Sequence, residues 1–297
     1  MTVLEIIQRS TEFLQQKGVE SPRLQIEWML AHVLQMPRLK LYLNFDRALV
    51  EPELNRLRDM VRRRAAREPL QHILGTTSFC GLEMKCSRAA LIPRPETEIL
   101  AEHGWKFLNV LPVCNRQGAD GQLQTGRTLA LDLGTGTGCI AIALAAHAPL
   151  TAVHAVDVSA DALALAQENA VANKAAERIA FHLGDGFNVL PAGLKFDLIA
   201  SNPPYIAAAE ITTLQPEVRD FDPRIALDGG ADGLDFYRRI AREAGAWLQP
   251  GGRLMVEFGG GQAGDVEKIF SDEKWIVVEI VADYSPQPRI LIARQAD

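Results

Sequence analysis

The sequence is poor in cysteine, and this scarcity argues against a structural metal site or a disulfide framework. Its four cysteines include no Cys-x-x-Cys pair, and its six histidines are scattered. Zinc sites need closely spaced ligands, and small disulfide-stabilised secreted domains need a higher density of cysteine. We therefore expect no bound metal and a reducing, cytoplasmic environment. The cysteines are Cys80, Cys86, Cys114 and Cys139.

The chain also lacks a long apolar run and an excess of positive charge. No stretch approaches the roughly 20 apolar residues that a membrane span needs. Residues 1–9 begin an amphipathic helix and carry no basic residues ahead of an apolar core, as a signal peptide would. The formal net charge is -6, whereas nucleic-acid partners usually demand a basic surface. These features predict neither a membrane partner nor a direct nucleic-acid partner.

The most informative motif that is present is Asn202-Pro203-Pro204-Tyr205, at the end of the apolar run 196–201. Open α/β sheets bind ligands at the carboxyl ends of their strands. The Asn202 side-chain oxygen and the Pro203 carbonyl can accept both protons of a planar amide or amino nitrogen, and Tyr205 can stack on the flat group. A nitrogen held in this way can aim its lone pair at an electrophilic methyl group. We predict that Asn202, Pro203, Pro204 and Tyr205 bind the substrate and catalyse this methylation. An ordinary strand-ending turn is the alternative, because Asn-Pro is common in turns.

A glycine turn lies upstream, between an apolar strand over 128–133 and an alanine-rich helix that starts at Cys139. This is the first half of a mononucleotide-binding unit. A dinucleotide fingerprint needs glycine at its sixth position, which Cys139 occupies here. Asp132 before the turn suits S-adenosylmethionine, which carries a cationic amino group and a sulfonium. The alternative is a turn that only joins strand to helix. The predicted cofactor-binding residues of this segment are Asp132, Gly134, Thr135, Gly136, Thr137 and Gly138.

The next two predicted strands also end in carboxylates. Asp157 follows the strand 152–156, about twenty residues past the glycine turn, where a carboxylate binds a ribose diol. Asp185 follows the strand 179–183 and is placed to accept a hydrogen bond from an adenine amino group, with Gly186 or Phe187 near the ring. Asp185 as an ordinary turn residue is the alternative. Asn202 is expected to contact the cofactor as well.

Several segments together resemble the HemK-type (PrmC) glutamine methyltransferases that modify peptide chain release factors. They are residues 91–98 (Leu-Ile-Pro-Arg-Pro-Glu-Thr-Glu), 132–138 and 201–206, and residues 21–34 and 68–75 extend the resemblance over nearly the whole chain. It implies an α/β, Rossmann-like methyltransferase fold dependent on S-adenosylmethionine, with a seven-stranded mixed sheet. It also implies methylation of the glutamine side chain in a release factor's Gly-Gly-Gln loop. Gly186 departs from the family pattern, because a tryptophan or another large residue flanks the adenine there. An aromatic contact at this point would have to come from Phe187.

The pattern of apolar residues divides the chain into three parts. Residues 1–75 repeat apolar positions at intervals of three and four, which predicts a small N-terminal helical bundle. In the resembled family this part helps to bind the release factor. Residues 76–95 are expected to form a hairpin linker and residues 96–297 the methyltransferase catalytic domain. The basic run 62–67 is predicted as a solvated helix face rather than a patch for RNA or an acidic partner.

Near the end of the chain, residues 233–248 are predicted as a helix that ends at Pro250-Gly251-Gly252. Residues 253–258 are then predicted as a strand. Residues 275–282 and 289–293 are predicted as two final strands joined by a turn. Such an ending gives the sheet one antiparallel strand, unlike a wholly parallel dinucleotide fold.

Three other functions are compatible with parts of the sequence. A methyltransferase for a ribosomal-protein glutamine would share the Asn202 motif. An adenine or guanine amino-methyltransferase would need basic and aromatic surfaces near Tyr205 to hold a flipped base, and residues 206–210 supply neither. A non-catalytic S-adenosylmethionine sensor could keep the glycine turn and Asp157 but would not need Asn202 and two prolines.

Overall fold

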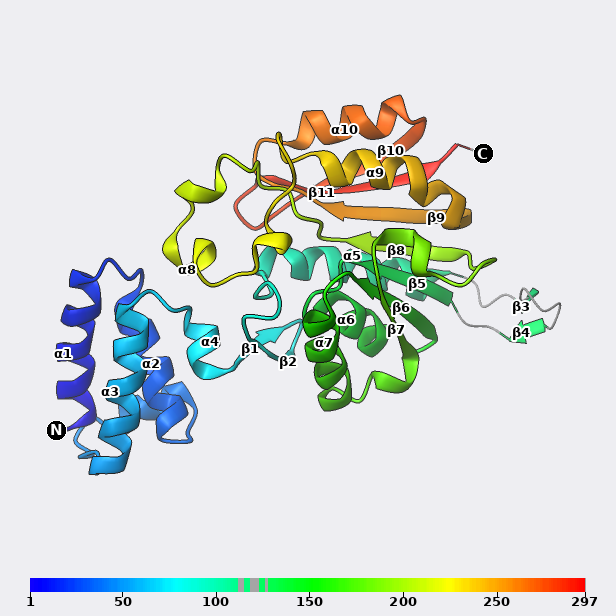
Figure 1. Cartoon of the computed structure of the whole chain (residues 1–297). Helices are drawn as coiled ribbons and strands as arrows, with labels where there is room; N and C mark the ends of the chain where they lie inside the picture. The colour runs from blue at the N-terminus through cyan, green and yellow to red at the C-terminus, as the bar shows by residue number, and fades with distance from the viewer. Residues whose placement is uncertain (112–114, 118–122, 126–127, 297) are drawn as a thin grey trace. The chain divides into compact units, whose positions relative to one another are not determined.

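The computed structural model describes residues 1–111, 115–117, 123–125 and 128–296 (Figure 1). Its contacts divide the chain into two units. The first contains Met1–Thr76 together with Gln215–Phe221, and the second contains Thr77–Leu214 and Asp222–Asp297. Within the described residues, no helix is both long enough and apolar enough to cross a membrane.

The first unit is helical. Its helix α1 is capped by Thr2, whose Oγ1 accepts a hydrogen bond from the Glu5 amide while the Glu5 carboxylate accepts one from the Thr2 amide. This reciprocal arrangement satisfies two backbone donors at the helix start. Apolar residues on one stripe of each long helix form a single core. The helices are α1 (Val3–Gln16), α2 (Pro22–Val33), η1 (Arg38–Leu43), α3 (Glu51–Ala65), α4 (Leu70–Leu74) and α8 (Pro216–Arg219).

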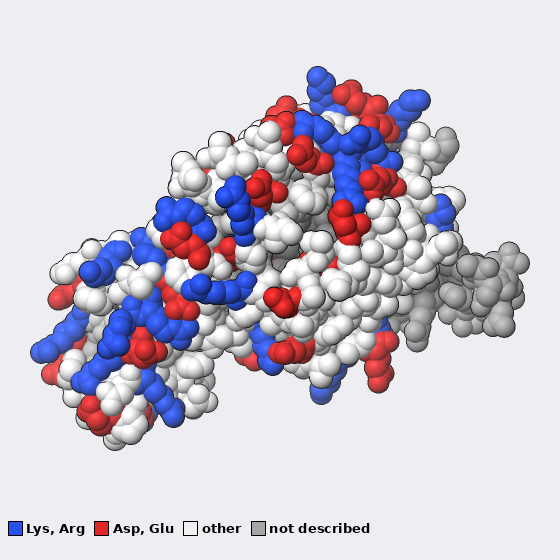
Figure 2. All heavy atoms as spheres, in the orientation of Figure 1, with Lys and Arg blue, Asp and Glu red and all other residues white. Residues whose placement is uncertain are grey.

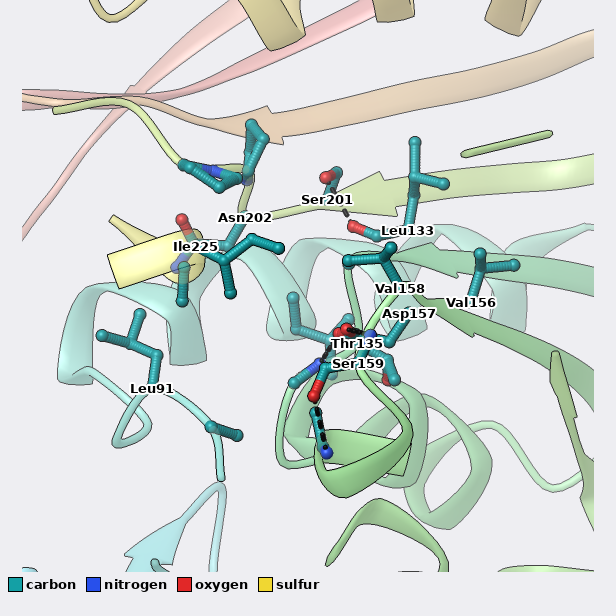
Figure 3. A pocket seen from close by; sticks show the side chains of 18 of the residues that line it. Leu91, Leu133, Thr135, Val156, Asp157, Val158, Ser159, Ser201, Asn202 and Ile225 are labelled. Atoms are coloured by element: carbon teal, nitrogen blue, oxygen red, sulfur yellow. Dashed lines mark hydrogen bonds between the residues drawn. The ribbon is translucent and has the colours of Figure 1, made fainter. Parts of the chain in front are cut away.

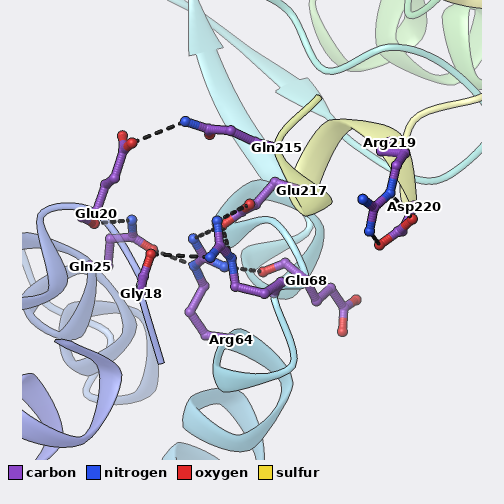
Figure 4. A network of polar contacts seen from close by, with 10 residues as sticks. Gly18, Glu20, Gln25, Arg64, Glu68, Gln215, Glu217, Arg219 and Asp220 are labelled. Carbon is purple, nitrogen blue, oxygen red and sulfur yellow. Dashed lines mark hydrogen bonds and ion pairs between the residues drawn. The ribbon is translucent and has the colours of Figure 1, made fainter. Parts of the chain in front are cut away.

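Helix α8 joins the first unit through ion pairs of Glu217 (Figure 4). Its partners are Arg64 in α3 and Arg67, which lies just after the end of α3. Glu217 Oε1 lies 2.7 Å from Arg64 Nη2, and Glu217 Oε2 lies 2.6 Å from Arg67 Nη2. The Arg64 side chain is only 4% exposed. The prediction of a solvated helix face for the basic run is therefore wrong for Arg64, because its partner lies far along the chain.

The second unit is built on a seven-stranded sheet in the order β10-β11-β9-β8-β5-β6-β7. Strand β11 is antiparallel to both of its neighbours, and the other neighbouring pairs are parallel. The predicted seven-stranded mixed sheet is thus confirmed. The strands are β5 (Thr128–Leu133), β6 (Thr151–Asp157), β7 (Ile179–Leu183), β8 (Phe196–Ser201), β9 (Leu248–Glu257), β10 (Trp275–Ala282) and β11 (Pro288–Gln295).

Helices cover both faces of this sheet (Figure 1). Helices α5 (Pro95–Val110), α6 (Cys139–His147) and α7 (Ala160–Ala172) pack on one face, and α9 (Asp235–Glu243) and α10 (Ala263–Asp272) pack on the other. Successive residues of one strand enter opposite cores, as Ala130 and Leu131 of β5 do. Strands buried on both faces read as continuous apolar runs, which explains why the sequence reveals β8 so clearly.

The remaining elements are short. Among the described residues, two separate two-stranded sheets are formed by β1 (Thr76–Phe79) with β2 (Leu82–Lys85), and by β3 (Asn115–Gln117) with β4 (Leu123–Thr125). Single turns of 3-10 helix are η2 (Ala176–Arg178), η3 (Gly186–Val189), η4 (Ile211–Thr213), η5 (Arg224–Ala226) and η6 (Ala244–Trp247).

Pro250-Gly251-Gly252, which the sequence predicts as a helix-ending turn, instead lies inside β9. The predicted helix is divided into α9 and η6. The register between β8 and β9 shifts there, from Phe196 opposite Leu248 to Leu198 opposite Arg253. Such a bulge accommodates a proline, which cannot donate to the ladder.

Candidate active site

The second unit contains a cavity of about 360 Å³ at the carboxyl ends of β5, β6 and β8 (Figure 3). Strand β5 has β6 on one side and β8 on the other, so the cavity opens where the strand order reverses, the usual ligand position in such sheets. Most of the predicted site residues line it: Gly134, Thr135, Gly136, Thr137, Asp157, Asp185, Gly186, Phe187, Asn202, Pro203 and Pro204. Three predicted residues, Asp132, Gly138 and Tyr205, are not part of its lining.

Asp132 lies buried beneath the glycine turn. Its Oδ2 accepts hydrogen bonds from Thr135 Oγ1 at 2.6 Å and from the Ala141 amide in the first turn of α6 at 3.0 Å. Burial raises the pKa of Asp132 to about 7. Its other oxygen, Oδ1, is buried with no hydrogen-bond partner among the described residues. The carboxylate therefore caps α6 with one oxygen and keeps the second free for a donor.

Gly138 does not line the cavity; it allows α6 and α7 to pack closely. Its φ is +81°, and a Cβ at this position would lie 3.0 Å from the Ala166 Cβ of α7. Any larger residue would push α7 away from the start of α6. The close approach of two helices explains why a glycine is needed at the end of this turn.

The Asp157 carboxylate is held in place by backbone amides on both sides. Its Oδ2 accepts a hydrogen bond from the Gly136 amide at 2.8 Å, and its Oδ1 accepts one from the Ser159 amide at 2.9 Å. Ser159 in turn caps α7 through the Ala162 amide. Each carboxylate oxygen has a further lone pair, so Asp157 can still accept from a ligand hydroxyl in the cavity.

Asp185 and Gly186 contact Arg239 of α9, a residue that the sequence analysis did not predict. Arg239 Nη1 lies 2.5 Å from Asp185 Oδ1. The Arg239 guanidinium also occupies the space over Gly186, where a Cβ would clash with it. Arg239 lines the cavity. The glycine at position 186, which leaves space beside Asp185, was the available signal that another side chain fills this space.

Phe187, the expected aromatic substitute, is buried and stacks on Trp247 with 5.9 Å between ring centroids and an angle of 17°. Its ring belongs to the core on the α9 and α10 face of the sheet. The flat group next to Gly186 is therefore the Arg239 guanidinium.

The Asn202 motif is fixed from several directions. Ser201 Oγ donates to the Leu133 carbonyl at 2.7 Å, which joins the ends of β8 and β5 (Figure 3). Asn202 Nδ2 donates to Thr97 Oγ1 of α5 at 3.0 Å. Tyr205 turns away from the cavity, since its ring lies against Gly259 and burial raises its pKa to about 12. The Asn202 amide is thus the polar side chain that the motif presents to the cavity.

A glycine-rich segment, residues 227–233, supports the backbone of this motif and was also missed. The Ile206 amide donates to the Leu227 carbonyl at 3.0 Å, and the Gly229 amide donates to the Ile206 carbonyl at 2.9 Å. A Cβ on Gly229 would lie 2.8 Å from the Pro204 carbonyl oxygen. Close backbone contact therefore requires glycine, and the run Asp228-Gly229-Gly230-Ala231-Asp232-Gly233 was its signal.

The described residues contain no group of three or more His, Cys, Asp or Glu side chains placed to hold a metal ion. The described cysteines, Cys80, Cys86 and Cys139, are free thiols. Burial raises the pKa of Cys86 to about 12. Cys86 is therefore protonated near neutral pH and is a weak nucleophile.

The comparisons with known proteins agree with this geometry. The model of the PrmC N-terminal domain matches residues 5–75, and the model of the methyltransferase small domain matches residues 121–217. A release factor glutamine methyltransferase of Geobacter sulfurreducens is 46% identical over 270 residues, which are 91% of this chain and 88% of the relative. One of Fusobacterium nucleatum is 38% identical over 99% of this chain and 79% of its own length.

Solved structures support the fold alone. The hMettl16 catalytic domain, crystallised with the MAT2A 3'UTR hairpin 1, has a TM-score of 0.53 at 16% identity, and the match covers 93% of this chain and 92% of that one. The curated relatives carry far more weight, because their identity is higher and extends through both units. The chain belongs to the release factor glutamine methyltransferase family.

Proposed function

We propose that this protein transfers a methyl group from S-adenosylmethionine to the side-chain amide nitrogen of the glutamine in the Gly-Gly-Gln loop of a peptide chain release factor. Family membership supports the reaction. The observation that carries the residue assignment is the position of Asn202, at the end of β8 and on the cavity wall, with its NH₂ group bonded to Thr97. The side-chain oxygen of Asn202 is therefore left to accept a hydrogen bond from an N–H of the substrate.

The chemical difficulty is the weak nucleophilicity of an amide nitrogen, whose lone pair is delocalised into the carbonyl. An acceptor fixed on each N–H would favour the pyramidal nitrogen that must form as the new bond is made. Asn202 Oδ1 would hold one proton and the Pro203 carbonyl the other. Such preorganised partners act on charge that develops in the transition state. Proline locks φ and has no N–H, so the backbone acceptor stays fixed.

The residues of the cavity fit the cofactor. Asp132 Oδ1 is a buried acceptor without a partner among the described residues, which suits a cationic amino group near the turn. Asp157 is oriented by two amides and would accept from the ribose hydroxyls. Asp185 would accept from the adenine amino group. When bound, S-adenosylmethionine supplies an electrophilic methyl group on a positively charged sulfur.

The first unit is proposed to dock the protein substrate. Its match to the PrmC N-terminal domain supports this role. Basic and acidic side chains are interspersed on the face drawn in Figure 2. Several charged side chains of α3 are held in ion pairs: Glu51, Glu53, Arg58, Arg63 and Arg64. Such a surface favours a protein partner over a nucleic acid. A release factor substrate would place the activity in the cytoplasm, where translation ends.

A direct test combines labelling and mapping. The purified protein is incubated with methyl-labelled S-adenosylmethionine and either a release factor or ribosomal proteins, and the labelled residue is identified by mass spectrometry. We expect label on the Gly-Gly-Gln glutamine, and none when the Asn202→Ala variant is used. Label on a ribosomal-protein glutamine alone, or on a nucleic acid alone, would contradict the proposed substrate.

A further inference from the structure

A buried chain of hydrogen bonds connects Asn202 to a carboxylate behind the cavity. Asn202 Nδ2 donates to Thr97 Oγ1 at 3.0 Å, and Thr97 Oγ1 donates to Glu257 Oε2 at 2.7 Å. Thr97 and Glu257 are each 2% exposed. The three residues come from the end of β8, the first turn of α5 and the end of β9. Three elements that meet at one edge of the sheet therefore contribute to one polar relay.

The chemistry of the relay determines its direction. A threonine hydroxyl has a single proton, and an ionised carboxylate can only accept. The Thr97 proton must therefore go to Glu257, and Thr97 Oγ1 must accept from its other neighbour. Of the two ends of the Asn202 amide, only the NH₂ can donate. The reversed amide would set its oxygen against an oxygen that has no proton to offer.

We propose that Thr97 and Glu257 are positioning residues for methyl transfer, which hold the Asn202 amide in the one orientation that presents Oδ1 to the substrate nitrogen. This inference rests on the proposed function and adds two residues to its machinery. Thr97 lines the cavity beside Asn202, whereas Glu257 does not reach it. Glu257 would act on the reaction only through Thr97.

The position of Glu257 makes this orientation dependent on pH. Burial is the main cause that raises the pKa of Glu257 to about 7, and the bond from Thr97 opposes it. The Glu257 backbone is fixed separately, because Tyr237 Oη donates to its carbonyl at 2.8 Å. The other titratable or charged groups that face the Glu257 carboxyl are Glu96, Arg94, Arg289, Tyr205 and Tyr237.

Protonation of Glu257 removes the constraint on the amide. A neutral carboxyl group can donate to Thr97 Oγ1, and the Thr97 proton is then free to point at Asn202. Thr97 can then hydrogen-bond to either end of the Asn202 amide, and only the orientation with Oδ1 in the cavity can hold the substrate nitrogen. The turnover rate should therefore fall as the pH drops through the pKa of Glu257.

The test compares variants that differ in the relay alone. Thr97→Val keeps the shape and loses the hydroxyl, and Thr97→Ser keeps the hydroxyl and serves as the matched control. Glu257→Gln keeps the size of the side chain but can donate as well as accept. The readouts are kcat and KM for methylation of the release factor over about pH 5.5 to 9, and the Kd of S-adenosylmethionine by calorimetry.

We expect Thr97→Val to lower kcat by roughly ten- to a hundredfold, the scale of losing a residue that only orients a functional group, with an unchanged cofactor Kd. Thr97→Ser should stay within about threefold of the wild type, because its hydroxyl can complete the same bonds. Glu257→Gln should lower kcat and abolish the acidic limb of the kcat profile near pH 7 when the cofactor is saturating. Protonation of Asp132, whose pKa is also about 7, would instead weaken cofactor binding. A role in folding alone would not remove that limb, and the valine and serine pair decides the matter even if Glu257→Gln does not fold.

Two results would separate the relay from the reaction it serves. If Thr97→Val and Glu257→Gln keep the wild-type kcat and pH profile while Asn202→Ala is inactive, the relay is wrong and the proposed function stands. If the wild-type protein methylates no release factor, the proposed function fails, and the relay is overturned with it.

Discussion

At the scale of single residues, the polar groups of the cavity are oriented by the protein itself. Asp157 is held by two backbone amides, Asp185 by Arg239, and Asn202 by Thr97. Groups fixed before a ligand arrives lose little freedom when it binds, so more of each contact contributes to affinity or rate. The groups that orient the predicted residues therefore contribute to affinity and rate along with the predicted residues.

Asp157→Ala is expected to weaken cofactor binding, because a charged acceptor for a hydroxyl contributes roughly 1.5 to 3 kcal/mol. Calorimetry with S-adenosylmethionine measures the change in Kd. Asp161→Ala is the matched control, since Asp161 is an exposed carboxylate close by in α7 that does not line the cavity. An unchanged Kd for Asp157→Ala would rule out the ribose assignment.

Asn202→Asp should retain activity above that of Asn202→Ala, and its pH dependence should oppose that of the wild type. The new carboxylate has no NH₂ to give Thr97 and competes with Glu257 for one hydroxyl proton. Its protonated form can donate to Thr97 and present a carbonyl oxygen to the cavity. The kcat of this variant should therefore rise as the pH falls, while the wild-type kcat falls. A kcat that falls in parallel with the wild type would contradict this account.

At the scale of elements, the sequence predicts the strands whose position depends on a local pattern of apolar residues. The apolar runs identify β6, β7 and β8, and the polar residues at or just after their ends, Asp157, Asp185 and Asn202, all line one cavity. The support for the Asn202 motif escaped prediction because residues 227–233 bind it through backbone amides and glycine contacts. Such contacts depend on how the chain returns to the site. Side-chain pattern carries little information about that path.

Helix α9 provides the clearest case, because Arg239 was not predicted and yet occupies the space over Gly186. We expect Arg239→Ala to raise the Kd of S-adenosylmethionine, since a guanidinium that packs on an aromatic face contributes about 0.5 to 2 kcal/mol. The loss would also free Asp185 from its partner. Arg238→Ala is the control, as Arg238 pairs with Asp232 and Asp235 outside the cavity.

Equal cofactor affinities for Arg239→Ala and Arg238→Ala would show that Arg239 only neutralises Asp185. A weaker affinity for Arg239→Ala alone supports a contact with the adenine ring. Both variants remove one positive charge from α9, so a difference in cofactor Kd between them must come from where the guanidinium lies.

At the scale of the whole molecule, the sequence predicts a helical bundle and a catalytic domain joined by a linker, but not that a later segment of the chain returns to the first unit. Gln215–Phe221 belongs with the first unit although the residues on both sides belong to the second. Arg64 and Glu217 are distant in sequence, and no periodicity connects them. Long-range ion pairs of this kind cannot be inferred from one sequence, because any exposed arginine offers the same pattern.

Glu217→Ala should lower the stability of the first unit. It leaves the buried Arg64 guanidinium without its carboxylate, and breaking a buried pair in this way costs about 3 to 5 kcal/mol. Glu217 is itself 15% exposed, which favours the lower end of that range. Asp220→Ala is the control, because the Arg219 and Asp220 pair is exposed (Figure 4) and exposed pairs add little to stability. Denaturant unfolding that gives equal losses for both variants would show that the buried pair adds nothing.

The separate helical unit also predicts a preference for a folded protein substrate. If residues 1–75 dock a surface of the release factor remote from the glutamine, that binding energy can be used to orient the amide against Asn202, which raises the rate as well as the affinity. A folded release factor should then have a kcat/KM roughly a hundredfold or more above that of a peptide carrying its Gly-Gly-Gln loop. A cyclic peptide with the same loop controls for loop conformation. Equal kcat/KM for the protein and the cyclic peptide would remove the docking role from the first unit, while methylation of either at the glutamine would leave the chemistry assigned to Asn202 intact.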